Sequence, residues 1–205
     1  MLAREIFNID MALGYLAWAL LTMTYIWPRL KAMDRVEAQR AIATFNSFRF
    51  FGLVFLLPGF VGANLPQAFA VPTAYGDLAT AMLAILALVT VRVRFLFWPL
   101  IWAFNLFGLA DLVMATVNAV RTHLPSVAGQ LGLAYAIPML YVPALVCMHL
   151  VALWLLLRPA PAPVRAACAW MSLAATEYQE RSTSDGRNDE QCESALHGRR
   201  WIERR

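Results

Sequence analysis

Apolar residues run along this chain in long segments that charged residues interrupt at only a few places. The longest segment without Asp, Glu, Lys or Arg covers residues 122–157, and shorter ones precede it. About 20 consecutive apolar residues are enough to cross the hydrocarbon core of a bilayer. The pattern therefore predicts an all-α fold, a polytopic membrane helical bundle.

Prolines and charged residues divide the bundle into five predicted transmembrane helices. Pro28 and Arg29 are expected to end the first, Pro58 and Gly59 to kink the second, and Arg92 to help close the third. The predicted spans are residues 7–27, 48–64, 73–91, 95–120 and 134–157.

Two of the connecting segments have a predicted place at the membrane interface. Residues 29–47 predict a short amphipathic helix there, with Ala38, Ala41, Ile42 and Phe45 on one side. Residues 65–72, bracketed by prolines, predict a tight connector lying in the interface.

Basic residues predict the orientation of the bundle. They are abundant between residues 29 and 49, absent from the second loop, and present again as Arg92 and Arg94 in the third. The fourth loop has only Arg121 and the C-terminal side opens with Arg158. Because cytoplasmic loops are enriched in Lys and Arg, the N-terminus is expected outside and the C-terminus inside.

The chain changes character after the last apolar segment. Residues 1–158 form the predicted transmembrane domain, and residues 159–205 form a Pro-rich linker followed by a charged, aliphatic-poor stretch. Such a composition buries too little apolar surface to fold, so a disordered cytoplasmic tail is expected.

Composition agrees with a membrane protein and narrows the choice of partners. The chain of 205 residues is 60% hydrophobic and 15% charged, whereas soluble domains carry about 25% charged residues. Its net charge of +4 comes with a basic cluster at 29–49 that is typical of a cytoplasmic loop. We therefore expect the lipid bilayer as a partner and no nucleic acid, while a homo-oligomer or a membrane-protein partner stays open.

The three cysteines have no paired spacing, so no disulfide frame, metal site or cofactor is predicted.

Asp111 is the most informative polar residue because it lies deep in a predicted span. It belongs to a stripe of small and polar residues at three- and four-residue spacing: Gly108, Asp111, Ala115, Asn118 and Thr122. A carboxylate at that depth is costly unless it faces protein or water. Two alternatives stay open, a seam that packs helices through hydrogen bonds and a catalytic or transport role.

Asn118 and three further residues, Asp77, Asn105 and His149, complete the set of polar candidates. Asp77 is expected in the first turns of the third span, where free backbone N–H groups stabilise it. His149 and Asn105 lie at matching depths, so a hydrogen bond between them is expected. Arg49 is expected to extend to the interface from the mouth of its helix.

These residues predict an outward-facing polar crevice. Asp77, Asp111 and Asn118 are expected to line it, with residues 66–72 as its rim and His149 and Asn105 as its floor. Two carboxylates in one such cavity would each raise the pKa of the other, leaving at least one protonated near neutral pH.

The sequence constrains function more weakly than topology. No G-x-x-x-x-G-K-[ST], G-x-S-x-G or H-E-x-x-H motif occurs, which argues against the enzyme classes that use them. Enzymatic activity stays open, with a non-enzymatic role favoured. The leading hypothesis is a small permease-like or accessory membrane component; the alternatives are a membrane-embedded enzyme acting on a lipid-soluble substrate and a structural or assembly subunit of a membrane complex.

Short motifs with fixed Pro, Gly, Asp, Asn and His positions follow one another between residues 48 and 149. They are Phe48-Arg49-Phe50-Phe51-Gly52, Leu57-Pro58-Gly59, Leu65-Pro66, Phe69-Ala70-Val71-Pro72, Gly76-Asp77, Asn105-Leu106-Phe107-Gly108, Asp111-Leu112, Ala134-Tyr135-Ala136-Ile137-Pro138, Val142-Pro143 and His149. The chain resembles, over residues 48–158, an uncharacterised family of small bacterial multi-pass inner-membrane proteins. That resemblance implies the bacterial cytoplasmic (inner) membrane and no assigned activity. The tail departs from the family pattern and is assigned no function.

Overall fold

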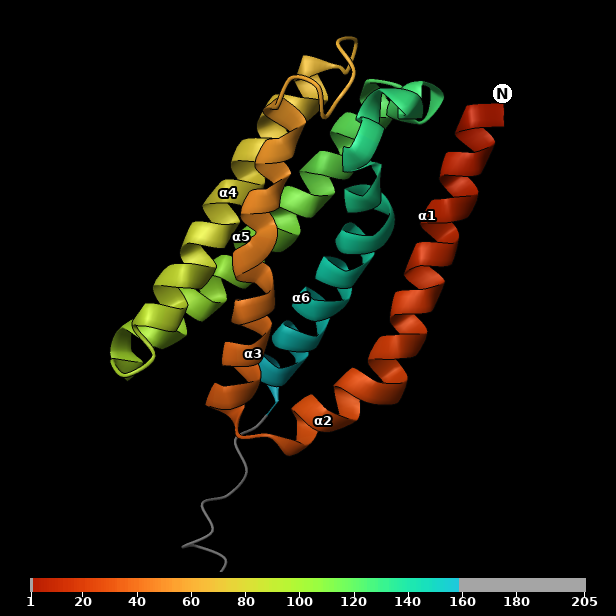
Figure 1. Ribbon diagram of the computed structural model, residues 1–205. Helices are drawn as coiled ribbons and strands as arrows, with labels where there is room; N and C mark the ends of the chain where they lie inside the picture. The colour runs from red at the N-terminus through yellow and green to blue at the C-terminus, as the bar shows by residue number, and fades with distance from the viewer. Residues whose placement is uncertain (1, 159–205) are drawn as a thin grey trace, which may run out of the picture. The chain divides into compact units, whose positions relative to one another are not determined.

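The computed structural model describes residues 2–158, and every regular element in that range is a helix (Figure 1). The α-helices are α1 (Leu2–Leu21), α2 (Trp27–Ala32), α3 (Arg35–Ser47), α4 (Gln67–Val89), α5 (Arg94–Arg121) and α6 (Val142–Leu157). Short π-helical segments are η1 (Thr22–Ile26) and η4 (Ile137–Tyr141), and 3-10 segments are η2 (Phe48–Leu56) and η3 (Leu124–Tyr135). The predicted tail, residues 159–205, lies outside the described residues.

Four helical stretches are long and apolar enough to cross a membrane. They are Leu2–Ala32, Gln67–Val89, Arg94–Arg121 and Ile137–Leu157. The first, third, fourth and fifth predicted spans fall on these four stretches, with the third beginning earlier than expected, at Gln67 rather than Thr73. The predicted connector 65–72 is correspondingly shortened, since Gln67 onward is already helix.

The second predicted helix, 48–64, is displaced toward the N-terminus. Helical backbone runs without interruption from Arg35 through η2 to Leu56, and Pro58 and Gly59 lie in the irregular segment after it. The predicted interfacial helix at 29–47 is therefore not separate from the bundle. Its residues after Asp34, which caps α3 by accepting a hydrogen bond from the Val36 N–H at 3.0 Å, form the first half of this longer helix.

Polar contacts confirm that α3 belongs to the bundle interior. Ala38 and Ile42 are fully enclosed, and the buried Gln39 side chain donates from Nε2 to the Ala152 carbonyl of α6 at 3.0 Å. Ala41, which the sequence placed on the same side, is exposed.

Prolines inside two of the helices are accommodated by π segments. A proline ring clashes with the carbonyl four residues earlier and has no N–H to donate. Just before Pro28, the Trp27 N–H bonds to the Thr22 carbonyl, five residues back, and Val142 bonds in the same way to Ile137 just before Pro143. This widened register lets the helix continue through Pro28, where the sequence predicted that it would stop.

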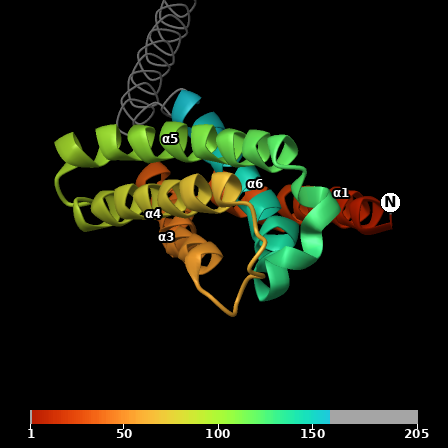
Figure 2. The same cartoon turned by 90° about the horizontal axis from the view of Figure 1, so that it is seen from above.

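Two apolar clusters occupy opposite ends of the bundle. The Phe97 cluster gathers buried residues from the end of α2, the start of α3, the end of α4, the start of α5 and the end of α6. The Leu131 cluster gathers residues from the start of α1, the end of η2, the start of α4 and from η3 and η4. Successive helical stretches therefore run antiparallel, as Figure 1 shows, and α4 and α5 lie side by side in both views (Figure 2).

The segment after η2 closes the bundle against η3 at the Leu131 end. The Gly62 N–H donates to the Gln130 carbonyl at 2.7 Å, and the Asn64 N–H donates to Gln130 Oε1 at 3.2 Å. Gly132 lies against the Phe60 carbonyl with φ +54° and ψ −130°, a conformation that only glycine adopts readily. The turn at this end is thus set by backbone contacts with one glycine at its centre.

Replacing Gly132 tests this closure. Gly132→Ala should lower the free energy of unfolding by about 1–3 kcal/mol, because the new side chain strains the backbone and meets the Phe60 carbonyl. The measurement is thermal unfolding in detergent followed by tryptophan fluorescence. Gly129→Ala, in the same segment with open space around it, is the control and should change stability by no more than about 0.5 kcal/mol. Equal effects of the two substitutions would contradict this account of the turn.

Candidate functional site

Arg49 lies at the centre of the bundle, fully enclosed, between two carboxylates. Its Nη2 is 2.7 Å from Asp77 Oδ1 and 2.7 Å from Asp111 Oδ2, and its Nε also donates to Asp77 Oδ1 at 2.8 Å. Its Nη1 is 3.2 Å from the Gly108 carbonyl oxygen and 3.2 Å from His149 Nε2. All three guanidinium nitrogens therefore have acceptors, as a buried cation requires.

The imidazole of His149 continues the network to α5. Its Nδ1 lies 3.0 Å from Asn105 Oδ1, and the Asn105 amide donates from Nδ2 to the Ile101 carbonyl at 2.8 Å. Because the guanidinium only donates, Nε2 accepts from Arg49 and Nδ1 carries the proton that goes to Asn105. This arrangement assigns a neutral imidazole, and it confirms the hydrogen bond that equal depths predicted.

The polar network, defined here as Arg49, Asp77, Asn105, Asp111 and His149, joins η2, α4, α5 and α6 in one layer. In chain order, Arg49 and Asp77 lie between residues of the Phe97 cluster and residues of the Leu131 cluster, and Asn105 and His149 adjoin Phe104 and Met148 of the Phe97 cluster. By helical rise, Asp77 lies about 15 Å from the start of α4 and Asp111 about 15 Å from the end of α5. Asp77 is thus mid-helix, and the expected stabilisation by free N–H groups of a first turn does not apply.

Three glycines let the helices approach closely enough for these contacts. At each one, a methyl group would overlap the carboxylate or imidazole of a neighbouring helix, so a larger residue would push the helices apart. The pairs are Gly52 with Asp77, Gly76 with Asp111, and Gly108 with His149.

A cavity of about 210 Å³ opens beside the network on the side of the Leu131 cluster. Asp77, Asp111 and Arg49 contribute to its lining at one side, together with the hydroxyl-bearing Thr73 and Thr116. The remaining lining is mostly apolar and comes from α1, η2, α4, α5, η3, η4 and α6: Phe7, Met11, Phe55, Phe69, Leu112, Ala115, Ala119, Val120, Leu124, Pro125, Ile137, Pro138 and Val142, with Asn8 as a polar exception.

The cavity includes part of the predicted crevice. Asp77 and Asp111 line it, and Phe69, from the predicted rim, contributes to its wall. Asn118 does not line it. At roughly 100° per residue, the face of α5 that lines the cavity is centred near Leu112, Ala115 and Ala119. Asp111 lies at one edge of that face, and Asn118 lies beyond Asp111, outside it. His149 and Asn105 also lie outside the lining, behind Arg49 rather than on a floor.

Arg49 is the residue that sequence reasoning misplaced. The predicted helix began at Phe48, which put Arg49 at its mouth, whereas the observed helix begins at Arg35 and carries Arg49 into the core. Two carboxylates deep in apolar helices require a cation, and Arg49 stands in an apolar segment with glycine three residues later. The need for a cation beside two buried carboxylates was the signal that could have identified Arg49.

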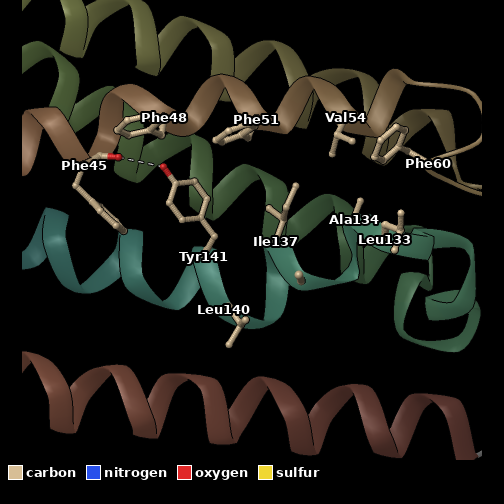
Figure 3. A pocket seen from close by; sticks show the side chains of 11 residues that line it. Phe45, Phe48, Phe51, Val54, Phe60, Leu133, Ala134, Ile137, Leu140 and Tyr141 are labelled. Carbon is tan, nitrogen blue, oxygen red and sulfur yellow. Dashed lines mark hydrogen bonds between the residues drawn. The ribbon is translucent and has the colours of Figure 1, made fainter.

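A larger hollow, about 510 Å³, lies between η2 and the η3–η4 region, but it has a different character (Figure 3). Phe48, Phe51, Ile137 and Leu140 are among the side chains around it, and none of its lining residues is charged. The Tyr141 hydroxyl in it donates to the Phe45 carbonyl at 3.1 Å. With no charged group and its hydroxyl already bonded, this groove offers apolar surface only, so the smaller cavity is the candidate site.

Comparison with known protein families shows to which family the chain belongs. The model of a family described as a domain of unknown function, DUF8737, matches residues 6–157. The chain belongs to the DUF8737 family. This finding agrees with the expected uncharacterised family and extends the matched region from residue 48 back into α1. No curated protein and no solved structure matches the chain. All members of the polar network of this DUF8737 chain lie inside the matched region.

The described part of this DUF8737 protein offers little for a metal ion. Among residues 2–158, no group of three or more His, Cys, Asp or Glu side chains is placed to hold one. The positions beside Asp77 and Asp111 that a metal would share are occupied by the Arg49 guanidinium. The chemistry available at the site is hydrogen bonding and charge pairing through carboxylates.

Removing the cation tests the network. Arg49→Gln should lower the free energy of unfolding by about 3–5 kcal/mol, because it leaves two buried carboxylates without their partner. Adding Asp77→Asn and Asp111→Asn to Arg49→Gln should restore most of that loss, since no unpaired charge then remains. Denaturant titration in detergent measures the free energy of unfolding of the unchanged protein, of Arg49→Gln and of the triple variant.

An exposed ion pair on α3 supplies the matched control. Arg40 Nη1 lies 2.6 Å from Glu37 Oε1 at the surface, so Arg40→Gln should cost at most about 1 kcal/mol. A triple variant no more stable than Arg49→Gln alone would show that the carboxylates do not depend on Arg49.

Proposed function

We propose that this protein is a multi-pass component of the bacterial inner membrane, permease-like or accessory to transport, that admits a small solute to the cavity beside its polar network. Four apolar helical stretches of spanning length support the membrane assignment. So do the large apolar side chains that the bundle leaves uncovered, such as Leu13, Leu16 and Leu20 on α1 and Phe107 and Val113 on α5. Surfaces of that kind suit lipid rather than water.

The proposal includes a fifth crossing, made by α3 and η2 together. These residues run continuously from Arg35 to Leu56, a length of about 37 Å by α-helical and 3-10 rise, which is enough to cross a hydrocarbon core of about 30 Å. They connect the Phe97 end to the Leu131 end, as each of the other helical stretches does. Arg49 lies inside this helix, where Asp77 and Asp111 compensate its charge.

One observation carries the functional proposal: the polar network is not sealed, because Asp77 and Asp111 reach a cavity between the helices. Ionisable residues inside a membrane are expensive and typically mark a pathway or a binding site. A network used only for packing would gain nothing from a cavity beside it, since unfilled space removes dispersion contacts.

A second candidate, a structural or assembly subunit, is favoured by a different observation. Every guanidinium nitrogen of Arg49 is paired within the protein, so the network satisfies its own cation without a ligand. The two candidates differ in whether solutes reach the cavity, and this difference is measurable.

The topology is tested by reporters fused at the turns. With five crossings and the N-terminus outside, fusions after Met33 and Arg94 should report the cytoplasm and fusions after Gln67 and Gly129 the outside. Gln67 is decisive because it follows the α3–η2 helix. A cytoplasmic signal there would show that this helix does not cross, leaving four spans.

Access to the cavity is tested with a charged thiol reagent. In a protein whose Cys147, Cys168 and Cys192 are replaced by serine, Ala115→Cys should react with the membrane-impermeant cation MTSET added outside intact spheroplasts. The reason is that Ala115 lines the cavity, where a thiol in contact with water can lose its proton and react as the thiolate.

The control is Val113→Cys on the outer face of the same helix. Val113 is exposed on the bundle surface, so in a membrane its thiol lies among acyl chains and should stay unmodified. If Ala115→Cys and Thr116→Cys are as unreactive as Val113→Cys, the cavity is closed to solutes and the structural reading replaces the permease-like one.

A further inference from the structure

We infer that the cavity selects a ligand with one protonated amine and a short apolar body. This inference rests on the proposed function, since it names the ligand class of the same site. Three features of the cavity lead to it: which charged atoms a ligand can reach, the sum of the charges, and a buried hydroxyl without a partner.

The charge that faces the cavity is negative. Arg49 borders the cavity but is wholly enclosed with its nitrogens occupied, whereas the side chains of Asp77 and Asp111 each keep 10% of their surface exposed. Arg49 bonds to Oδ1 of Asp77 and to Oδ2 of Asp111, and the other oxygen of each carboxylate accepts no hydrogen bond from the described residues. A ligand at this wall therefore meets acceptors, which suit a donor and repel an anion.

The charges of the network do not sum to zero. One guanidinium stands against two carboxylates, and the imidazole of His149 is neutral by its hydrogen bonds. One negative charge is left at a site removed from bulk water, where an unpaired charge is costly. Either a proton on one carboxylate or a monovalent cation in the cavity compensates it.

Thr73 supplies an independent indication. Its side chain lines the cavity from α4, one helical turn before Asp77, and the residue is only 7% exposed. Its Oγ1 is buried without a hydrogen-bond partner among the described residues, although buried hydroxyls are normally paired. Together with Asp77 and Asp111 it provides three oxygen acceptors, and a primary ammonium group has three N–H donors.

The rest of the cavity fits the apolar part of such a ligand. Phe7, Phe55 and Phe69 line it, with Leu124 and Ile137. Its volume of about 210 Å³ suits a short alkyl chain rather than a long one. The ligand class is thus a small amphiphilic amine.

Three compounds that share one chain length test the inference: hexylamine, hexanol and hexanoate, each titrated at pH 7 into the full-length protein in a neutral detergent. Hexylamine should raise the melting temperature in a saturable manner, because a ligand that binds the folded state stabilises it. Hexanol and hexanoate should give no saturable shift. Asp111→Asn should weaken hexylamine binding by roughly tenfold or more.

Two further variants keep the test independent of folding. Thr73→Val, which preserves side-chain shape, should also weaken hexylamine binding, while Asn118→Ala, on α5 but outside the cavity, should bind as the unchanged protein does. Each variant is compared with its own melting temperature without ligand.

The outcomes separate the two proposals. If hexanol stabilises as well as hexylamine, or Asp111→Asn and Thr73→Val bind hexylamine unchanged, the cavity is apolar and unselective and the inference fails. If none of the three compounds shifts the melting temperature while MTSET still modifies Ala115→Cys, the open cavity stands and the amine class is wrong. If MTSET does not react either, the proposed function fails with it.

Discussion

The burial of Arg49 is the constraint on which this bundle depends. A guanidinium removed from water needs acceptors on every nitrogen, and no single helix can provide them. The acceptors come from α4, α5 and α6: the carboxylates of Asp77 and Asp111, the Gly108 carbonyl and the His149 imidazole. All four helices must therefore meet within hydrogen-bonding distance at one level. Glycines at the crossing points make that approach sterically feasible.

This layer and the apolar clusters have different physical roles. Burial and close packing in the Phe97 and Leu131 clusters contribute attraction that depends little on register. The polar network depends on register strictly, because sliding one helix by a turn, about 5.4 Å, would break its bonds and leave charges unpaired. We therefore assign specificity of alignment to the network and most of the cohesion to the clusters, which is the division expected where buried ion pairs add little net stability.

The sequence predicted helices well where hydrophobicity alone defines them and failed where charges are compensated in space. The limits of α5 came within a residue of those expected, because apolar segments end at Arg94 and Arg121. The α3–η2 helix was displaced because Arg35, Glu37 and Arg40 made its first half look like a separate interfacial helix. Asp77 and Asp111 were expected to line one cavity together, and His149 was correctly paired with Asn105. Arg49, the common partner of Asp77 and Asp111, was misplaced: the two carboxylates call for a cation, but a local pattern does not show which distant residue supplies it.

The geometry also links the cavity to the packing of the helices. Asp111 shares its carboxylate between Arg49 and the cavity, so any group that pairs with it there changes the strength of the Arg49–Asp111 contact. That contact joins η2 to α5. By thermodynamic linkage, occupancy of the cavity and the closeness of these two helices must then affect each other to the same extent. Packed interfaces shift between discrete arrangements rather than deform gradually. Through this coupling, a small solute bound in the cavity would change the arrangement of η2 and α5.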